Sequence, residues 1–236
     1  MSNPTRFTSG VSTAYSGEVF YSYPYPDPFH TASQQNLGST SYMNDFNTLI
    51  GTDYIITGTS STFALADGIG GQAILTPGGT TTATSTYKRG SSFQFVAGNR
   101  FWFTTRFQAS AVSGTKSFYV GLQAGSATTD GIWFAKAASS TSVNLVSTVN
   151  STATTLVTGV TTATAGAWIE VGFYFDGTDL LVYNNNQMIA RLTSPTIGAS
   201  NAGLTNALIT PVLQITPTAT DTLTVDYIGT AQELSR

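Results

Sequence analysis

The chain has 236 residues, of which only 9% are charged, with a formal net charge of −3 and no cysteine. So little positive charge excludes nucleic acid as a main partner, and the lack of cysteine excludes disulfides and thiolate metal sites. No stretch approaches membrane-spanning length and the first residues lack the apolar run of a signal peptide, so we expect no membrane partner, and synthesis in a cytoplasm without export by the usual route.

Residues 1–40 differ in composition from the rest. Residues 19–29 hold three prolines and five aromatic side chains, and proline disfavours helix for itself and for the residue before it. Ser/Thr/Gly-rich flanks complete the prediction of an extended N-terminal arm, followed by one domain over residues 41–236. The arm aromatics either fold back over the domain or reach a neighbouring subunit, because large rings are favoured at interfaces. They are Phe20, Tyr21, Tyr23, Tyr25 and Phe29.

Short strand-like segments recur from residue 41 onward, separated by Gly, Asp and Asn. Such regular spacing predicts an all-β sandwich with no helix longer than a turn or two. The last segment is expected to pair with the first of them. The predicted strands are 42–46, 54–59, 62–66, 71–75, 84–88, 93–95, 100–109, 117–124, 131–136, 143–147, 152–157, 168–176, 180–183, 187–191, 207–216 and 222–231.

Two of these segments alternate between a largely apolar set and a mixed set of side chains. Alternation with a period of two places one set of side chains on a single face of a strand. We therefore predict that the apolar set enters the core: Phe101, Phe103, Phe107, Ile169, Val171, Phe173 and Phe175.

Residues 163–191 predict a three-stranded antiparallel meander. Trp168 precedes an alternating strand, Asp176-Gly177 supplies a tight turn, and Asn184-Asn185-Asn186 tolerates the positive φ of a hairpin loop. The pattern resembles the back-sheet meander of concanavalin-like (laminin-G, pentraxin and lectin-type) jelly rolls. That resemblance implies a jelly-roll β-sandwich, a fold that serves lectins, glycosidases, adhesion modules and structural domains.

Glycoside hydrolysis needs two carboxylates placed together. The glutamates are Glu18 in the arm, Glu170, and Glu233 in the tail, and none has an acidic neighbour at a suitable spacing. We expect Glu170 to pair with a surface Lys or Arg, and the chain not to be an enzyme.

Other catalytic and metal chemistry has few candidates. His30, the only histidine, lies in the arm, where a general base is poorly held. Asp176 and Asp179 are the best pair for calcium, but Asp and Gly are also what a tight turn requires. We expect no cofactor and no metal.

Two further motifs have structural explanations. Residues 67–71, Asp-Gly-Ile-Gly-Gly, lack the helix and lysine of a phosphate loop and predict a hairpin turn. Trp102 and Trp133 either belong to the core or form a platform on which a sugar stacks.

Several short motifs spread along the chain resemble a family of tailed-bacteriophage virion proteins encoded with head genes. That resemblance implies a capsid decoration (cement) protein on the outer capsid surface of the virion. Such a protein is expected to bind the major capsid protein and other copies of itself, and a trimer is the oligomer expected first. The alternative is a carbohydrate-binding or host-adhesion module. The motifs are residues 4–12, Tyr25 to Pro28, Asn44-Asp45-Phe46, Leu65 to Gly68 with Gly70-Gly71, and Trp102 to Phe107.

Overall fold

The computed structural model describes residues 39–68, 70–79, 83–200, 203–216 and 221–233. Residues 1–38, which include His30 and the aromatic side chains of the predicted arm, lie outside the described residues. The described chain is all β apart from one short 3-10 turn, η2 (Gly51–Asp53). The strands are β1 (Ser39–Asn44), β2 (Tyr54–Thr57), β3 (Thr62–Ala66), β4 (Gln72–Thr76), β5 (Thr84–Lys88), β6 (Phe101–Ala109), β7 (Ser117–Ala124), β8 (Ala127–Lys136), β9 (Ser142–Val149), β10 (Thr152–Thr162), β11 (Ile169–Phe175), β12 (Leu180–Asn184), β13 (Gln187–Leu192), β14 (Thr210–Thr216) and β15 (Leu223–Glu233).

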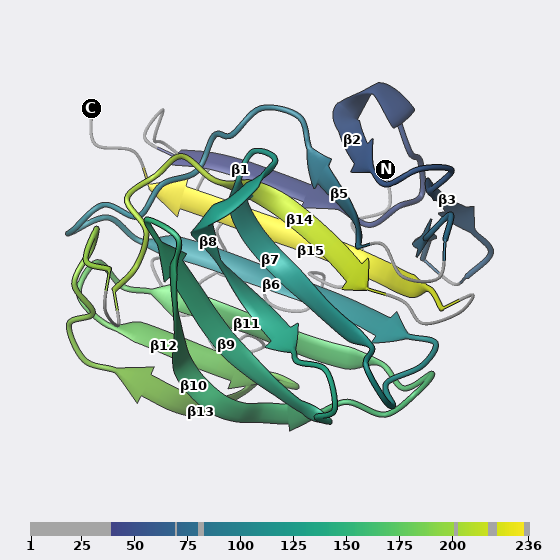
Figure 1. Ribbon diagram of the computed structural model, residues 1–236. Helices are drawn as coiled ribbons and strands as arrows, with labels where there is room; N and C mark the ends of the chain where they lie inside the picture. Colours follow the sequence, from purple (N-terminus) through teal and green to yellow (C-terminus); the bar gives the residue numbers. More distant parts are fainter. Residues whose placement is uncertain (1–38, 69, 80–82, 201–202, 217–220, 234–236) are drawn as a thin grey trace.

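The strands form two antiparallel sheets packed as a sandwich. Sheet A has the order β13-β12-β11-β6-β15-β4-β3, with β1 also paired to β15, and sheet B has the order β10-β9-β8-β7-β14-β5-β2. Figure 1 shows them as two layers, with β7 and β9 of sheet B crossing in front of β6 and β11 of sheet A. This arrangement is a concanavalin-like jelly roll, which confirms the predicted fold class.

The core between the sheets is rich in phenylalanine. Phe173 on β11 lies with its ring centroid 5.3 Å from that of Phe103 on β6 and 6.4 Å from that of Phe134 on β8, so it joins sheet A to sheet B. All seven residues predicted for the core are buried in this cluster. The alternation in the two strands therefore identified the inward face correctly.

The predicted meander is confirmed as β11-β12-β13, with β6 on its other side. Asp176 Oδ1 accepts hydrogen bonds from the backbone N–H of Thr178 and of Asp179, which closes the first turn. Asn185 and Asn186 close the second turn with φ of 47° and 62°, the left-handed conformation that Asn tolerates.

The ends of the chain meet as expected, with Tyr42 of β1 opposite Thr230 of β15. The first strand, however, spans residues 39–44 instead of 42–46, so it begins inside the predicted arm. Phe46 has φ of 53° and leaves the strand, and its buried ring packs edge-on against Phe63. Residues 93–95 form no strand, only an isolated bridge from Phe93 to Ile209. Side-chain alternation does not distinguish a paired segment from an unpaired one, which accounts for both differences.

Candidate functional site

The outward side of sheet B carries a cluster of aromatic side chains separate from the core. The register places Trp133 of β8 opposite Gly121 of β7, which lies opposite Val212 of β14 and, beyond it, Tyr87 of β5. These side chains face away from sheet A and pack with Tyr119 of β7. We call this outward side the sheet B face.

Two rings form the centre of the sheet B face. Trp133 and Tyr119 are stacked with ring centroids 5.0 Å apart and an interplanar angle of 28°. Glycine at position 131 lets the indole lie close to the backbone, because a Cβ added at Gly131 would lie 2.2 Å from Cζ3 of Trp133. The indole is 7% exposed.

Amide side chains converge on the hydroxyl of Tyr119. This hydroxyl donates toward Oε1 of Gln214 at 2.6 Å, and Oε1 of Gln123 lies 3.1 Å away. Gln123 in turn donates through Nε2 to the carbonyl of Gly125 at 2.7 Å. Burial raises the pKa of Tyr119, so the phenol stays neutral and remains a donor. The result is a neutral hydrogen-bonded group packed beside the Trp133 ring, in which Gln214 is half-buried and Tyr119, Trp133 and Gln123 are buried.

Asp130 is the only carboxylate in the strands of sheet B. Its Oδ1 accepts hydrogen bonds from Thr205 Oγ1 at 2.9 Å and from the backbone N–H of Asn150 at 3.2 Å. A glycosidase mechanism with two carboxylates would need a second one from outside these strands.

The sequence did not single out Tyr119, Gln123 or Gln214. Tyr119, Gly121 and Gln123 share one parity of the predicted strand 117–124, so an aromatic-Gly-amide alternation was visible there. Gln214 comes from β14, 95 residues further along than Tyr119, and no local pattern connects them.

The two tryptophans that the sequence proposed as one sugar platform lie on opposite sides of the sandwich. Trp102 of β6 packs on the outward side of sheet A with Tyr183 and Ala231, while Trp133 is on sheet B. Each tryptophan alternates with core residues along its strand, so the sequence shows that it faces outward. The same pattern does not show to which sheet the strand belongs. A single platform of Trp102 and Trp133 is therefore wrong, and only Trp133 lies on the sheet B face.

Ion pairs stand on the outward side of sheet A. Arg106 lies opposite Glu170 in register. The Nη1 atom of Arg106, however, donates to Asp226 Oδ2 at 2.8 Å, so Arg106 does not form the ion pair that was expected for Glu170. Arg100 binds Glu233 through Nε at 2.7 Å from Oε1. Burial opposes ionisation of Glu233, but the bonds from Arg100 outweigh it and lower the pKa of this carboxyl.

The loop proposed for calcium is built as a turn. Besides the Asp176 cap, Asp179 Oδ2 accepts from Arg191 Nε at 2.7 Å, and Asp179 Oδ1 accepts from the backbone N–H of Ser194 at 2.9 Å. The Ser194 and Arg191 bonds lower the pKa of Asp179. Within the described residues no three His, Cys, Asp or Glu side chains group to hold a metal ion.

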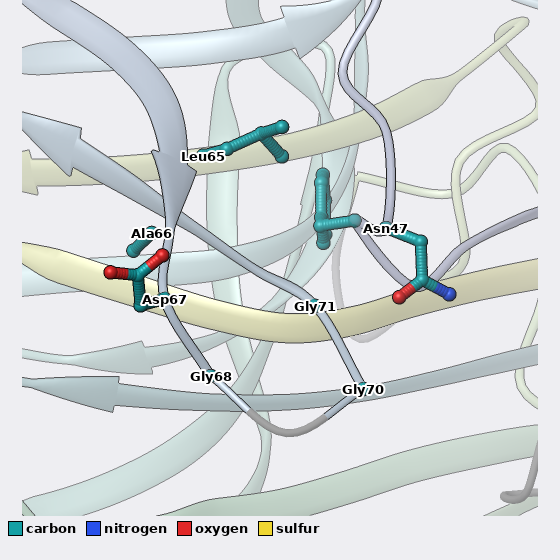
Figure 2. A pocket seen from close by; sticks show the side chains of 8 residues that line it. Asn47, Leu65, Ala66, Asp67, Gly68, Gly70 and Gly71 are labelled. Atoms are coloured by element: carbon teal, nitrogen blue, oxygen red, sulfur yellow. The ribbon is translucent and has the colours of Figure 1, made fainter.

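The predicted hairpin turn joins β3 and β4, with Asp67, Gly68, Gly70 and Gly71 among the described residues, and a shallow pocket of about 340 Å³ lies beside it. Figure 2 shows Leu65 and Asn47 on different chain segments around the glycine turn. At Gly71 (φ +83°) an added Cβ would lie 2.5 Å from the carbonyl oxygen of Asp45. This close backbone approach gives the glycines a structural role. No helix in the described part of the chain is long and apolar enough to cross a membrane.

No family model matches the chain, and no curated protein matches it in sequence. Many solved structures share the fold. They include an endo-1,3-β-glucanase from Streptomyces sioyaensis, with 11% identity, 85% of this chain and 99% of that one covered, and a TM-score of 0.60. A carbohydrate esterase of the Shiga toxin-encoding bacteriophage phi24B has 15% identity, coverage of 84% and 100%, and a TM-score of 0.54. An endo-β-galactosidase from Clostridium perfringens has 11% identity, coverage of 84% and 63%, and a TM-score of 0.56.

These neighbours correct the expectation that the chain is not an enzyme. Several of them are glycoside hydrolases, so the architecture is one that supports catalysis, and the spacing of glutamates along the sequence gives no ground to exclude it. Carboxylates distant in sequence can meet across a sheet, which a search for closely spaced acids misses. At these identities the likeness shows the fold alone and assigns no reaction.

Proposed function

We propose that the protein binds carbohydrate on the sheet B face, as a glycan-recognition module of a virion or cell surface. The observation that carries the proposal is the stacked Trp133–Tyr119 pair with its hydroxyl held by Gln214 and Gln123. Sugar rings present C–H faces that pack on aromatic rings, and hydroxyls that exchange hydrogen bonds with neutral amides and phenols. The sharing of this fold by the glucanase, esterase and galactosidase supports the class of ligand.

Neutrality of the face also favours this ligand. None of the charged residues in the strands of sheet B, Lys88, Asp130 and Lys136, shares the outward parity of Trp133. A neutral, hydroxyl-rich ligand therefore meets no unpaired charge there, whereas a charged ligand would lose its hydration without gaining a partner.

The test is calorimetric titration of the full-length chain with β-1,3-gluco-oligosaccharides and with β-galactosides. Tyr119→Phe removes the phenolic donor, and Gln214→Ala removes a half-buried amide. Each is expected to weaken binding about fivefold, the effect of one lost hydrogen bond. Met188→Ala, on the exposed edge strand β13, is the matched control with unchanged affinity.

Two results would contradict the proposal: no binding of either glycan class by the unmodified chain, or equal binding by all variants. The same mixtures are analysed for shortened oligosaccharides, which would show turnover in addition to binding.

The more specific expectation from the sequence, decoration of a phage capsid through contacts with the major capsid protein and other copies, stays a prediction. Its test is whether the chain is found stoichiometrically on purified capsids.

A further inference from the structure

The outward side of sheet A has a buried donor for which the described residues provide no acceptor. Trp102, Tyr183 and Ala231 pack there with Tyr174 and Leu181, and we call this set the sheet A face. Trp102 is 4% exposed, and no acceptor within the described residues bonds its Nε1 atom. The indole N–H is a donor only, and buried polar groups of this kind are nearly always hydrogen-bonded. The face therefore requires a carbonyl or a similar acceptor from elsewhere.

The rings around this donor fit a proline-rich strand. Trp102 is stacked on Tyr174 with centroids 5.4 Å apart, and the guanidinium of Arg100 lies 5.7 Å from the centre of the Trp102 ring. Extended proline-rich segments dock on aromatic surfaces of this kind, because their backbone is already ordered and proline removes N–H donors while leaving carbonyl acceptors free.

The chain itself contains such a segment. Residues 23–28 read Tyr-Pro-Tyr-Pro-Asp-Pro, with proline at every second position. Three of its six residues have no backbone N–H, so the segment has more carbonyl acceptors than N–H donors. An excess of acceptors suits a surface on which the indole N–H of Trp102 needs one.

Residues 23–28 can reach the sheet A face, because β1, where the described chain begins, lies beside it. Ser41 of β1 lies opposite Ala231, Ala231 opposite Trp102, and Trp102 opposite Tyr174. The row from β15 to β12 is about 14 Å wide at the usual strand spacing. The chain from Pro28 to Ser39 can span roughly 35 Å, so the segment of the same chain reaches the face without a second copy.

We propose that residues 23–28 bind the sheet A face of their own chain and supply the acceptor for the indole N–H of Trp102. The proposal is independent of glycan binding, which concerns the opposite side of the sandwich.

The absence of native cysteine allows a direct test on the full-length chain. Ser22→Cys is combined either with Leu181→Cys, on the sheet A face, or with Ala153→Cys, an exposed position on β10 of sheet B. A short bismaleimide crosslinker is added, and the linked peptides are identified by mass spectrometry of the monomer band. We expect the Leu181 pair to link within one chain with a yield several-fold above that of the Ala153 pair.

Two variants in the Leu181 background test the contact itself. Trp102→Phe keeps a ring but removes the donor, and the yield should fall about fivefold, as for one lost hydrogen bond. Replacing Pro24, Pro26 and Pro28 with Ala should lower the yield as well. These substitutions leave the sandwich sequence unchanged, so they test the contact even if Trp102→Phe impairs folding.

Three results would overturn the proposal. Equal yields at Leu181 and Ala153 would show that the segment has no preferred site. Links only between chains would show that the occupant comes from a second copy. A yield unchanged in both the Trp102 and the proline variants would show that neither group holds the segment.

Discussion

The outer faces of the two sheets each centre on a tryptophan stacked on a tyrosine, but the groups around the rings differ. On sheet B the Trp133–Tyr119 pair is surrounded by glutamine amides that hold the phenol. On sheet A the Trp102–Tyr174 pair is flanked by Arg100 with its carboxylate partner, and the described part of the chain gives the Trp102 indole N–H no acceptor. Similar aromatic centres thus present a neutral hydroxyl-and-amide surface on one side and an unsatisfied donor on the other.

The difference follows from where charge stands in the strands. The strands of sheet A include Arg106, Glu170, Arg191, Asp226 and Glu233. Arg106 pairs with Asp226, Arg191 with Asp179, and Glu233 with Arg100. The outward positions of sheet B are neutral. The two faces therefore differ in the groups at the rim of each stacked pair and not in the rings themselves.

The largest expected effect comes from the core that supports both faces. Phe173→Ala should lower the free energy of unfolding by about 3–5 kcal/mol, because it leaves a cavity where the two sheets meet. Denaturant unfolding measures the change. Met188→Ala, at a side chain 55% exposed, should change it by less than about 0.5 kcal/mol. A loss below about 1 kcal/mol for Phe173→Ala would contradict the assigned packing.

The second largest expected effect is on the packing of Trp133, and it concerns the sheet B face alone. Gly131→Ala places a Cβ against the indole of Trp133 and 2.5 Å from the carbonyl oxygen of Leu122. We expect a cost of about 1–3 kcal/mol, as for overpacking, with a changed near-ultraviolet circular dichroism of the tryptophans. Gly51→Ala, which meets nothing within 4 Å, should be nearly neutral. An unchanged spectrum in Gly131→Ala would show that Trp133 does not lie over this glycine.

The smallest effect concerns the sheet A ion pair of Glu233 and Arg100. The lowered pKa means that the folded state favours the carboxylate, so its contribution is fully present above the unfolded pKa of about 4.3. It is lost as the pH falls through the lower folded pKa. Because the side chains are 31% and 39% exposed, we expect less than about 1 kcal/mol at pH 7. Melting temperatures of the unmodified chain and Glu233→Gln should differ at pH 7 and converge at low pH. A constant difference would exclude this ion pair as the source.

Local patterns were sufficient to predict most of the strands and the inward residues. Phe101, Phe103 and Phe107 share one parity of their strand while the other parity is mixed, and a strand has only two faces, so the apolar set must enter the core. The meander was predicted for the same reason, because the Asp176-Gly177 turn and the Asn185-Asn186 turn have their own backbone requirements. Where a segment lacked alternation, as in the first residues of β8, its start was missed.

The sequence by itself therefore determined the fold class, the core faces and the turns, which depend on neighbours a few residues away. Only the tertiary structure decided that Trp102 and Trp133 stand back to back on different sheets, and that Gln214 reaches Tyr119. An outward side chain has the same alternating pattern whichever sheet its strand joins, and the strand order depends on pairings between residues far apart in the chain.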